Sequence, residues 1–204
     1  MKIHIVDYGM GNIFSVQKKL LQENVTVSTS SDPQDILKAD KIILLGVGHF
    51  KRAMSNLKEL NLIDPLNDFA LTQKKPILGI CLGMQLMARF SEEGNSNGLG
   101  WIDASILKFK TSDSKKFKIP HMGWNTVNSI NKSSLLNGLE PDEEFYFVHS
   151  FYIQPNDPKL IMTETQYIES FCSGVEKENI FGVQYHPEKS HDSGRTIFKN
   201  FISL

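Results

Sequence analysis

The chain has 204 residues, of which 40% are hydrophobic and 22% are charged, and its formal net charge is −1. That length can bury a sizeable core in one domain, so we expect a single domain over residues 1–204. The charge predicts neither nucleic-acid nor membrane-surface binding, and no apolar run has the ~20 residues of a membrane span. The first residues lead into a strand, not a signal peptide, and two cysteines form no disulfide framework, so we expect the cytoplasm.

Strands alternate with helices through the first part of the chain. Short apolar runs predict strands at residues 2–6, 25–29, 41–45 and 76–80. Apolar spacing and an Asp32-Pro33 helix start predict helices at residues 13–23, 33–37, 52–60 and 64–73. This alternation predicts an α/β fold with a doubly wound, mostly parallel central sheet flanked by helices.

A pair of glycines follows the first strand, in the run Asp7-Tyr8-Gly9-Met10-Gly11-Asn12. Glycines after a strand are typical of dinucleotide-binding loops, but Phe14 stands where the third glycine of that pattern belongs. We therefore favour a plain strand-to-helix loop over a nucleotide site.

Cys81 lies where a strand is expected to become a helix. Residues 76–80 form an apolar run opened by a proline, as in a buried parallel strand. From Leu82 onward the apolar spacing, with Leu86 and Phe90 following, is helical. The pattern resembles the nucleophile elbow G-x-S-x-G, with cysteine in place of serine, in Gly79-Ile80-Cys81-Leu82-Gly83. A helix N-terminus favours a thiolate and offers the Leu82 amide to an oxyanion, whereas the plainer alternative is a buried structural cysteine.

A candidate base follows the strand expected at residues 179–185, which runs into His186-Pro187-Glu188. Residues two apart in an extended segment face the same side, so His186 and Glu188 should project together. The carboxylate would then orient the imidazole, as the third member of a triad does. A lone histidine on a strand is often structural, and His149 is a rival base that lacks a carboxylate two residues on. The sequence therefore predicts a triad of Cys81, His186 and Glu188.

Elements of the second half are less regular. Residues 91–100 are a polar, glycine-rich loop. We expect an exposed turn at residues 111–116 and a final helix at residues 195–202. Further strands are expected at residues 101–109, 145–148 and 168–175. The last of these holds Cys172, for which we expect packing rather than chemistry.

Separated motifs carry a resemblance that covers the chain almost end to end. The run Gly79-Ile80-Cys81-Leu82-Gly83-Met84-Gln85 and the run His186-Pro187-Glu188-Lys189 are similar to class I (triad) glutamine amidotransferases. More narrowly, residues 7–12, 46–50 and 120–125 resemble the glutaminase subunits of imidazole glycerol phosphate synthases, which act in histidine biosynthesis. Departures occur at Leu45, where the family has proline, and at Phe151, where tyrosine is more usual.

The resemblance implies hydrolysis of glutamine, without cofactor or metal, and delivery of ammonia to a separate (β/α)₈ cyclase subunit. It places the two oxyanion-binding backbone amides at Val47 and Leu82. Contacts to glutamine are implied for Gln85, Glu93, His149, Ser150 and Phe151. Contacts to the cyclase subunit are implied for Asn12, His121, Met122, Trp124, Asn125 and Lys189.

Three other functions remain open. A paralogue could supply ammonia to a related synthase for amidino or amino sugars of surface polysaccharide, and the residues at Leu45, Phe151 and His191 keep this possible. A cysteine peptidase of similar topology is disfavoured, because Gln85 and Glu93 suit a free amino acid. The third is a catalytically inactive interaction module.

Overall fold

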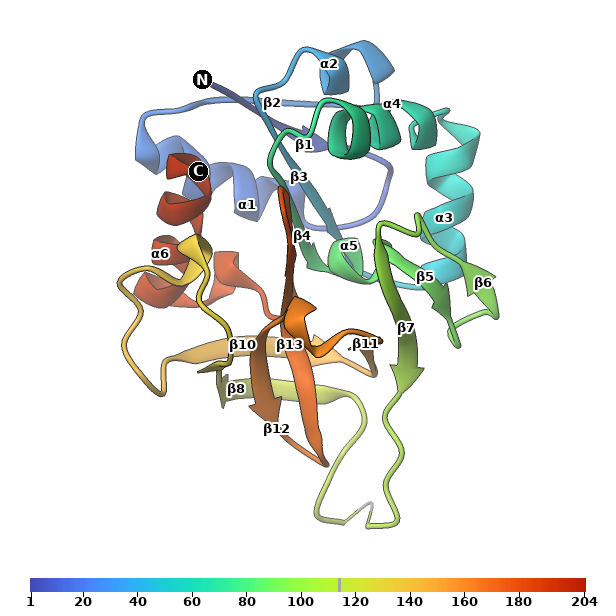
Figure 1. Ribbon diagram of the computed structural model, residues 1–204, viewed down its shortest axis with the longest axis vertical. Coiled ribbons are helices and arrows are strands. Elements are labelled where there is room, and N and C mark those ends of the chain that lie inside the picture. The colour runs from blue at the N-terminus through green and yellow to red at the C-terminus, as the bar shows by residue number, and fades with distance from the viewer. Residues whose placement is uncertain (114) are drawn as a thin grey trace.

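A computed structural model describes residues 1–113 and 115–204 (Figure 1). Its helices are α1 (Ile13–Leu20), α2 (Pro33–Leu37), α3 (Phe50–Glu59), α4 (Ile63–Asn67), α5 (Leu82–Gln85) and α6 (His191–Ser203). The first strands are β1 (Lys2–Val6), β2 (Thr26–Ser30), β3 (Lys41–Gly46), β4 (Ile77–Cys81), β5 (Ala88–Ser91), β6 (Ser96–Asn97) and β7 (Ile102–Lys108). The others are β8 (His121–Thr126), β9 (Asn128–Ser129), β10 (Glu144–His149), β11 (Phe151–Pro155), β12 (Ile161–Gln166), β13 (Ser170–Lys177) and β14 (Ile180–Val183).

Five parallel strands form one side of the main sheet, from the edge strand β2 inward, in the order β2-β1-β3-β4-β14. Every residue of β3 is buried, because successive side chains enter different layers. Ile42 and Leu44 pack in the layer under α2, α3 and α4, and Ile43 and Leu45 pack in the layer under α1 and α6. Figure 1 shows helices on both faces of these strands. The predicted doubly wound α/β fold is confirmed.

Beyond β14 the sheet is mostly antiparallel, which the sequence analysis did not predict. β13 runs antiparallel to β14, β12 and β11, and β8 and β10 form a separate two-stranded sheet next to this extension (Figure 1). The expected strand at residues 168–175 is β13, whereas β8, β11 and β12 were not expected as strands. The site therefore lies where the parallel and antiparallel parts meet.

The helix expected after Cys81 is much shorter than its apolar spacing predicts. α5 ends at Gln85, and Phe90 lies in β5, opposite Asn97 of β6 and Ser105 of β7. The chain returns along this segment, with the N–H of Leu99 donating to the carbonyl of Leu86 at 2.8 Å. Pairing with residues that come later in the chain therefore overrides the local helical pattern, and the prediction for Phe90 is wrong.

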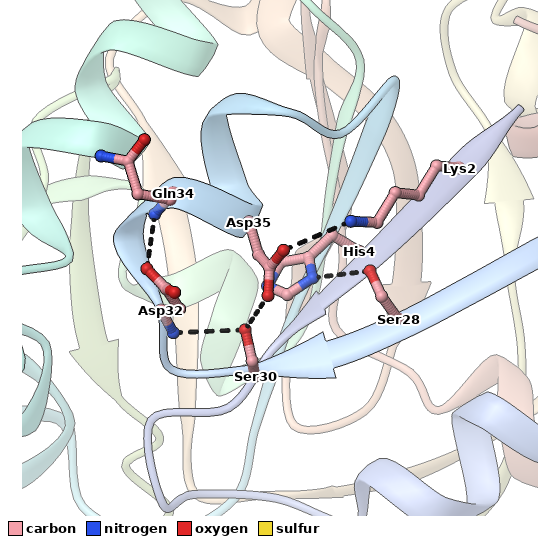
Figure 2. Close-up of polar contacts among 7 residues, drawn as sticks. All are labelled: Lys2, His4, Ser28, Ser30, Asp32, Gln34 and Asp35. Carbon is pink, nitrogen blue, oxygen red and sulfur yellow. Dashed lines mark hydrogen bonds and ion pairs between the residues drawn. The ribbon is translucent and has the colours of Figure 1, made fainter.

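The start of α2 matches the sequence prediction in detail. Asp32 caps the helix, because its carboxylate accepts a hydrogen bond from the N–H of Gln34 at 2.8 Å. Figure 2 shows the polar cluster around this cap. Asp35 accepts from the Ser30 hydroxyl at 2.7 Å and pairs with the Lys2 ammonium at 3.3 Å, which ties the helix to β2 and β1.

The remaining elements follow the expected order with shifted ends. α3 begins two residues earlier than expected and α6 four residues earlier, and a π-helical turn over Asp68–Thr72 continues α4. The turn expected at residues 111–116 includes Ser114, which lies outside the described residues. Across the described ranges, every helix is too short or too polar to reach across a lipid bilayer.

Candidate active site

The corner predicted at Cys81 is present and has a strained backbone. Cys81 ends β4 and caps α5 with φ 53° and ψ −112°, values that a non-glycine residue rarely adopts. A Cβ at Gly83 would lie 1.7 Å from the carbonyl oxygen of Leu44, and one at Gly79 would lie 2.7 Å from the backbone of Met84. Only glycine at these two positions lets α5 pack this closely on the strands.

His186 and Glu188 meet in a different way from the one expected. The imidazole Nδ1 lies 2.8 Å from the Glu188 carboxylate, and both side chains are only 3% exposed. The backbone is not extended here, because Pro187–Lys189 form a 3₁₀ turn that the N–H of Lys189 closes onto the carbonyl of His186. The predicted pairing is therefore present, but a proline-initiated turn brings it about.

The imidazole of His186 and the thiol of Cys81 share one end of the sheet. Cys81 is the last residue of β4 and His186 follows β14, and the carboxyl ends of these neighbouring parallel strands meet at the same edge. The imidazole Nε2 is buried and has no hydrogen-bond partner among the described residues. Burial disfavours the imidazolium, yet the nearby Cys81 sulfur and the Glu188 carboxylate outweigh it and raise the pKa of His186 to about 10. The raised pKa keeps the His186 imidazole protonated near neutral pH.

A pocket of about 260 Å³ opens at Cys81. It gathers every residue predicted to bind glutamine or an oxyanion, although these residues come from four separate segments. The lining residues are Val47, Gly48, Cys81, Leu82, Gln85, Glu93, Pro120, Val148, His149, Ser150 and Phe151. Val47 is 43% exposed, and the following Gly48 has φ +115°.

Two of these polar side chains already make contacts within the chain. Glu93 accepts a hydrogen bond from the N–H of Phe50 at 2.7 Å, so one carboxylate oxygen caps α3, whose first residue is Phe50. The amide nitrogen of Gln85 donates to the carbonyl of Phe151 at 3.0 Å and to the side-chain oxygen of Gln184 at 2.9 Å. Both N–H groups of Gln85 are thus in use, which leaves its side-chain oxygen for a ligand.

Gln184 is a residue of the site that the sequence analysis did not single out. Its side chain is completely buried, and its amide nitrogen donates to the sulfur of Cys81 at 3.5 Å. The one sequence signal for it is its position two residues before His186, on the same side of an extended chain.

His149 and His121 form a buried pair rather than a base and a contact residue. The carbonyl of Phe151 can only accept, so the Nδ1 atom of His149 donates to it at 2.8 Å, and the Nε2 atom accepts from His121 at 2.9 Å. Burial lowers the pKa of His149 to about 3 and that of His121 to about 4. Both rings are therefore neutral near pH 7, and the Nδ1–H group of His149 is occupied by its hydrogen bond to the carbonyl of Phe151.

The residues expected to contact a partner divide between two faces of β8. Side chains alternate along a strand, so Met122 and Trp124 point outward and are 62% and 44% exposed. His121 points inward and is 3% exposed, and its expected contact with a partner stays a prediction. Asn125, on the same side as His121, is partly buried and donates to the carbonyl of Gln166 at 3.0 Å.

The outward face of β8 continues through aromatic contacts. The Trp124 indole stacks on the His191 ring with centroids 5.0 Å apart. Tyr146 lies opposite Trp124 in β10, and the Lys189 ammonium sits 5.3 Å above the ring of Tyr146. We call Met122, Trp124, Tyr146, Lys189 and His191 the β8 face. Asn12, the other expected contact residue, is exposed at the start of α1.

Cys172 packs in β13, as expected. Its thiol donates to the carbonyl of Gly174 at 3.2 Å, and burial raises its pKa to about 12. Within residues 1–113 and 115–204, no group of three or more His, Cys, Asp and Glu side chains is arranged to hold a metal ion.

Comparisons with known proteins place the chain in a family. Residues 4–204 match the model of glutamine amidotransferase class-I. The chain is 50% identical to imidazole glycerol phosphate synthase subunit HisH 2 of Methanococcus maripaludis, covering 98% of each chain. It is 42% identical to subunit HisH 2 of Pseudomonas aeruginosa, covering 99% of each, and 42% identical to subunit HisH of Pelagibacter ubique, covering 100% of each.

Solved structures agree on the fold. PurLQS from Thermotoga maritima matches with a TM-score of 0.73 at 19% identity, over 99% of this chain and 97% of that one. The glutaminase domain of Trypanosoma brucei CTPS matches with a TM-score of 0.65 at 17% identity, over 100% of this chain and 94% of that one. A match over nearly the whole sequence, at up to 50% identity, leads to one conclusion: this chain belongs to the class-I glutamine amidotransferase family and groups there with the HisH subunits of imidazole glycerol phosphate synthase.

Proposed function

We propose that this chain is the glutaminase subunit of an imidazole glycerol phosphate synthase and that it releases ammonia from glutamine for a cyclase subunit. The observation that carries the proposal is the full-length similarity to HisH subunits, at 40–50% identity. The site at Cys81 supports it, because the pocket holds the thiol and Glu93, a carboxylate suited to an ammonium group, and the buried His186–Glu188 pair follows the neighbouring strand β14.

The reaction starts with the thiolate of Cys81 attacking the side-chain amide carbon of glutamine. The backbone N–H groups of Val47 and Leu82 bind the oxyanion of the tetrahedral intermediate, and one such donor is worth about 10²–10³ in rate. The imidazolium of His186 gives its proton to the departing nitrogen, and ammonia leaves a thioester on Cys81. Glu188 keeps the imidazole oriented and stabilises its charge.

Hydrolysis of the thioester completes the cycle. The neutral His186 takes a proton from water, the hydroxide adds to the thioester carbon, and the Cys81 thiolate leaves as glutamate forms. In the pocket Glu93 binds the α-ammonium group of glutamine, and the segment His149-Ser150-Phe151 holds its α-carboxylate. The oxygen of the Gln85 side chain is free to accept a hydrogen bond from the substrate.

The ammonia is used by a separate (β/α)₈ cyclase subunit, which docks on the β8 face and near Asn12. Exposed Trp124 and Met122 are the kind of side chains that anchor protein interfaces. We place this heterodimer in the cytoplasm, where a biosynthetic enzyme with two unpaired cysteines fits.

The test uses the full-length chain with a purified cyclase subunit and its ligand. Glutamine should be hydrolysed and the cyclase product should form, whereas Cys81→Ser should abolish the glutamine-dependent reaction and keep the ammonia-dependent one. Turnover of peptides in place of glutamine would point to a peptidase. Full glutamine-dependent activity in Cys81→Ser would rule out the mechanism.

A second candidate is a paralogue that supplies ammonia to a synthase of amidino or amino sugars. Two observations favour keeping this second function. The Methanococcus and Pseudomonas relatives carry the number 2 in their names, and this chain has substitutions at Leu45, Phe151 and His191. Glutamine-dependent product formation measured with each type of synthase subunit in turn separates the two functions, since only the true partner should stimulate glutaminase activity.

A further inference from the structure

Gln184 is placed beside the reactive sulfur by the pairing of two parallel strands. Val183 of β14 lies opposite Ile80 of β4, so the next residues along, Gln184 and Cys81, lie side by side at this end of the sheet. The N–H of Gln184 donates to the carbonyl of Ser173 at 2.8 Å, which anchors its backbone. Its side chain is 0% exposed.

Both ends of the buried Gln184 amide have partners that belong to the site. Its nitrogen donates to the Cys81 sulfur at 3.5 Å, and its oxygen accepts from the nitrogen of Gln85 at 2.9 Å. Burying an amide without hydrogen bonds would be strongly unfavourable, so these two contacts explain how a glutamine is tolerated here.

The orientation of the Gln184 amide follows from its neighbours. Gln85 must present its nitrogen, because that atom also donates to the carbonyl of Phe151 at 3.0 Å. Gln184 must then present its oxygen to Gln85, since two N–H groups would repel each other. The nitrogen of Gln184 is left facing the sulfur of Cys81.

An N–H group that faces sulfur interacts differently with a thiol and with a thiolate. Hydrogen bonds to a charged acceptor are roughly twice as strong as those to a neutral one, so the contact favours the thiolate. His186 stands two residues after Gln184, past a bend at Gln184 and Tyr185 that follows β14. One segment thus brings both the imidazole and a neutral donor to Cys81.

We propose that Gln184 is a positioning residue of the glutaminase site, whose amide holds the Cys81 thiolate with its nitrogen and the pocket residue Gln85 with its oxygen. This proposal deepens the proposed function and rests on it for the identity of the substrate. The alternative is that Gln184 only fills space between β14 and α5.

The first experiment measures the thiolate directly. The full-length chain is alkylated with iodoacetamide over a pH series, and the rate constant at Cys81 is followed by mass spectrometry, which separates it from the buried Cys172. Gln184→Met keeps the length of the side chain and removes the donor. Its alkylation midpoint should lie about one to two pH units above that of the wild type. An unchanged midpoint in a folded Gln184→Met protein would overturn the proposal.

The second experiment separates the two ends of the amide. With the cyclase partner present, Gln184→Met should lower kcat/KM for glutamine about 10- to 100-fold. Gln85→Met should raise KM and should shift the alkylation midpoint of Cys81 less than Gln184→Met does, because the Gln184 donor is still present. If Gln184→Met does not fold, Gln184→Glu replaces it, because it keeps the length and polarity of the side chain. It places a negative charge at the sulfur, so the alkylation midpoint of Cys81 should also rise.

A matched control removes a buried polar group elsewhere. The hydroxyl of Thr165 in β12 is buried and has no hydrogen-bond partner among the described residues, so Thr165→Val should change neither the midpoint nor kcat/KM. Equal shifts in Thr165→Val and Gln184→Met would mean that the effect is one of packing. Alkylation requires no glutamine, so it tests the Gln184–Cys81 contact even if the chain proves to use another substrate.

Discussion

His121 and His149 are buried side by side, with the Nδ1 atom of the first 2.9 Å from the Nε2 atom of the second. Both rings also contact the Phe147 ring, with centroids 4.8 Å and 5.6 Å away. The pair links β8, which carries the exposed Trp124, to the carbonyl of Phe151 in the pocket wall. A protonated ring would break this run of hydrogen bonds, because one nitrogen of each ring must accept.

The first prediction concerns stability at low pH. The folded-state pKa values, about 4 for His121 and about 3 for His149, lie below the ordinary value of 6.5. The unfolded chain therefore binds more protons below pH 6.5, so the stabilisation is full above that pH and is lost as the pH falls toward 4. Each histidine contributes a slope of up to about 1.4 kcal/mol per pH unit. Urea unfolding at pH 7.5, 6 and 5 measures this slope.

Replacing the pair provides the control for this effect. The double variant His121→Gln, His149→Gln should have a flatter dependence of unfolding free energy on pH, whatever its absolute stability. His49→Gln alters an exposed histidine and should keep the wild-type slope. Equal slopes in all three proteins would contradict the prediction.

The second prediction concerns Glu188. Its carboxylate helps to raise the pKa of His186 to about 10, so Glu188→Gln should lower the pH at which the imidazolium loses its proton. The variant should also lose about 10²–10⁴ in kcat for glutamine, as loss of a triad carboxylate does. Steady-state rates and an NMR titration of His186 measure the two effects. Activity within tenfold of the wild type would remove Glu188 from the triad.

The third prediction concerns the corner at Cys81. Gly83→Ala places a Cβ 1.7 Å from the carbonyl oxygen of Leu44, a backbone atom that cannot move aside, so the free energy of unfolding should fall by about 3 kcal/mol or more. Gly138→Ala meets nothing within 4 Å, but φ is +77°, so it should cost only about 1 kcal/mol. Urea unfolding of both variants compares the free-energy cost of atomic overlap with that of backbone strain. Equal losses would contradict the packing argument.

The fourth prediction separates two roles of Glu93. Glu93→Gln keeps an acceptor for the N–H of Phe50 but loses the charge proposed to bind the glutamine ammonium, so KM should rise about tenfold or more at nearly unchanged stability. Glu93→Leu removes both the hydrogen-bond acceptor and the charge, so it should also lower the free energy of unfolding by about 1 kcal/mol. KM values and unfolding curves are measured together. An unchanged KM in Glu93→Gln would leave Glu93 as a helix cap only.

The fifth prediction concerns the β8 face. Trp124→Ala should weaken binding of the cyclase subunit about 10- to 30-fold or more, since exposed tryptophans are common interface anchors. Leu71→Ala is the control, because Leu71 is 48% exposed and follows α4, whereas β8 lies at the other end of the molecule (Figure 1). Calorimetry of the purified subunits gives both affinities. Equal affinities for the two variants would place the partner elsewhere.

The sequence by itself determined the features that depend on neighbouring residues. The apolar run of β3 and the cap at Asp32 act within a few positions, so their patterns are readable in the chain. The glycines around Cys81 are readable as a motif, although Gly83 packs against Leu44 of β3. The pairing of His186 with Glu188 was also local enough to predict, although its 3₁₀ geometry was not. The resemblance to a known family supplied the residue roles that no local pattern contains.

Only the tertiary structure decided which distant segments meet. Gln184 lies at Cys81 because β14 pairs with β4, and Phe90 is in a strand because residues 97–105 run beside it. His121 turned inward because the alternation of β8 places Met122 and Trp124 outside. Such pairings gain their free energy from contacts between residues far apart in the chain, and no local pattern records which of the possible contacts will form.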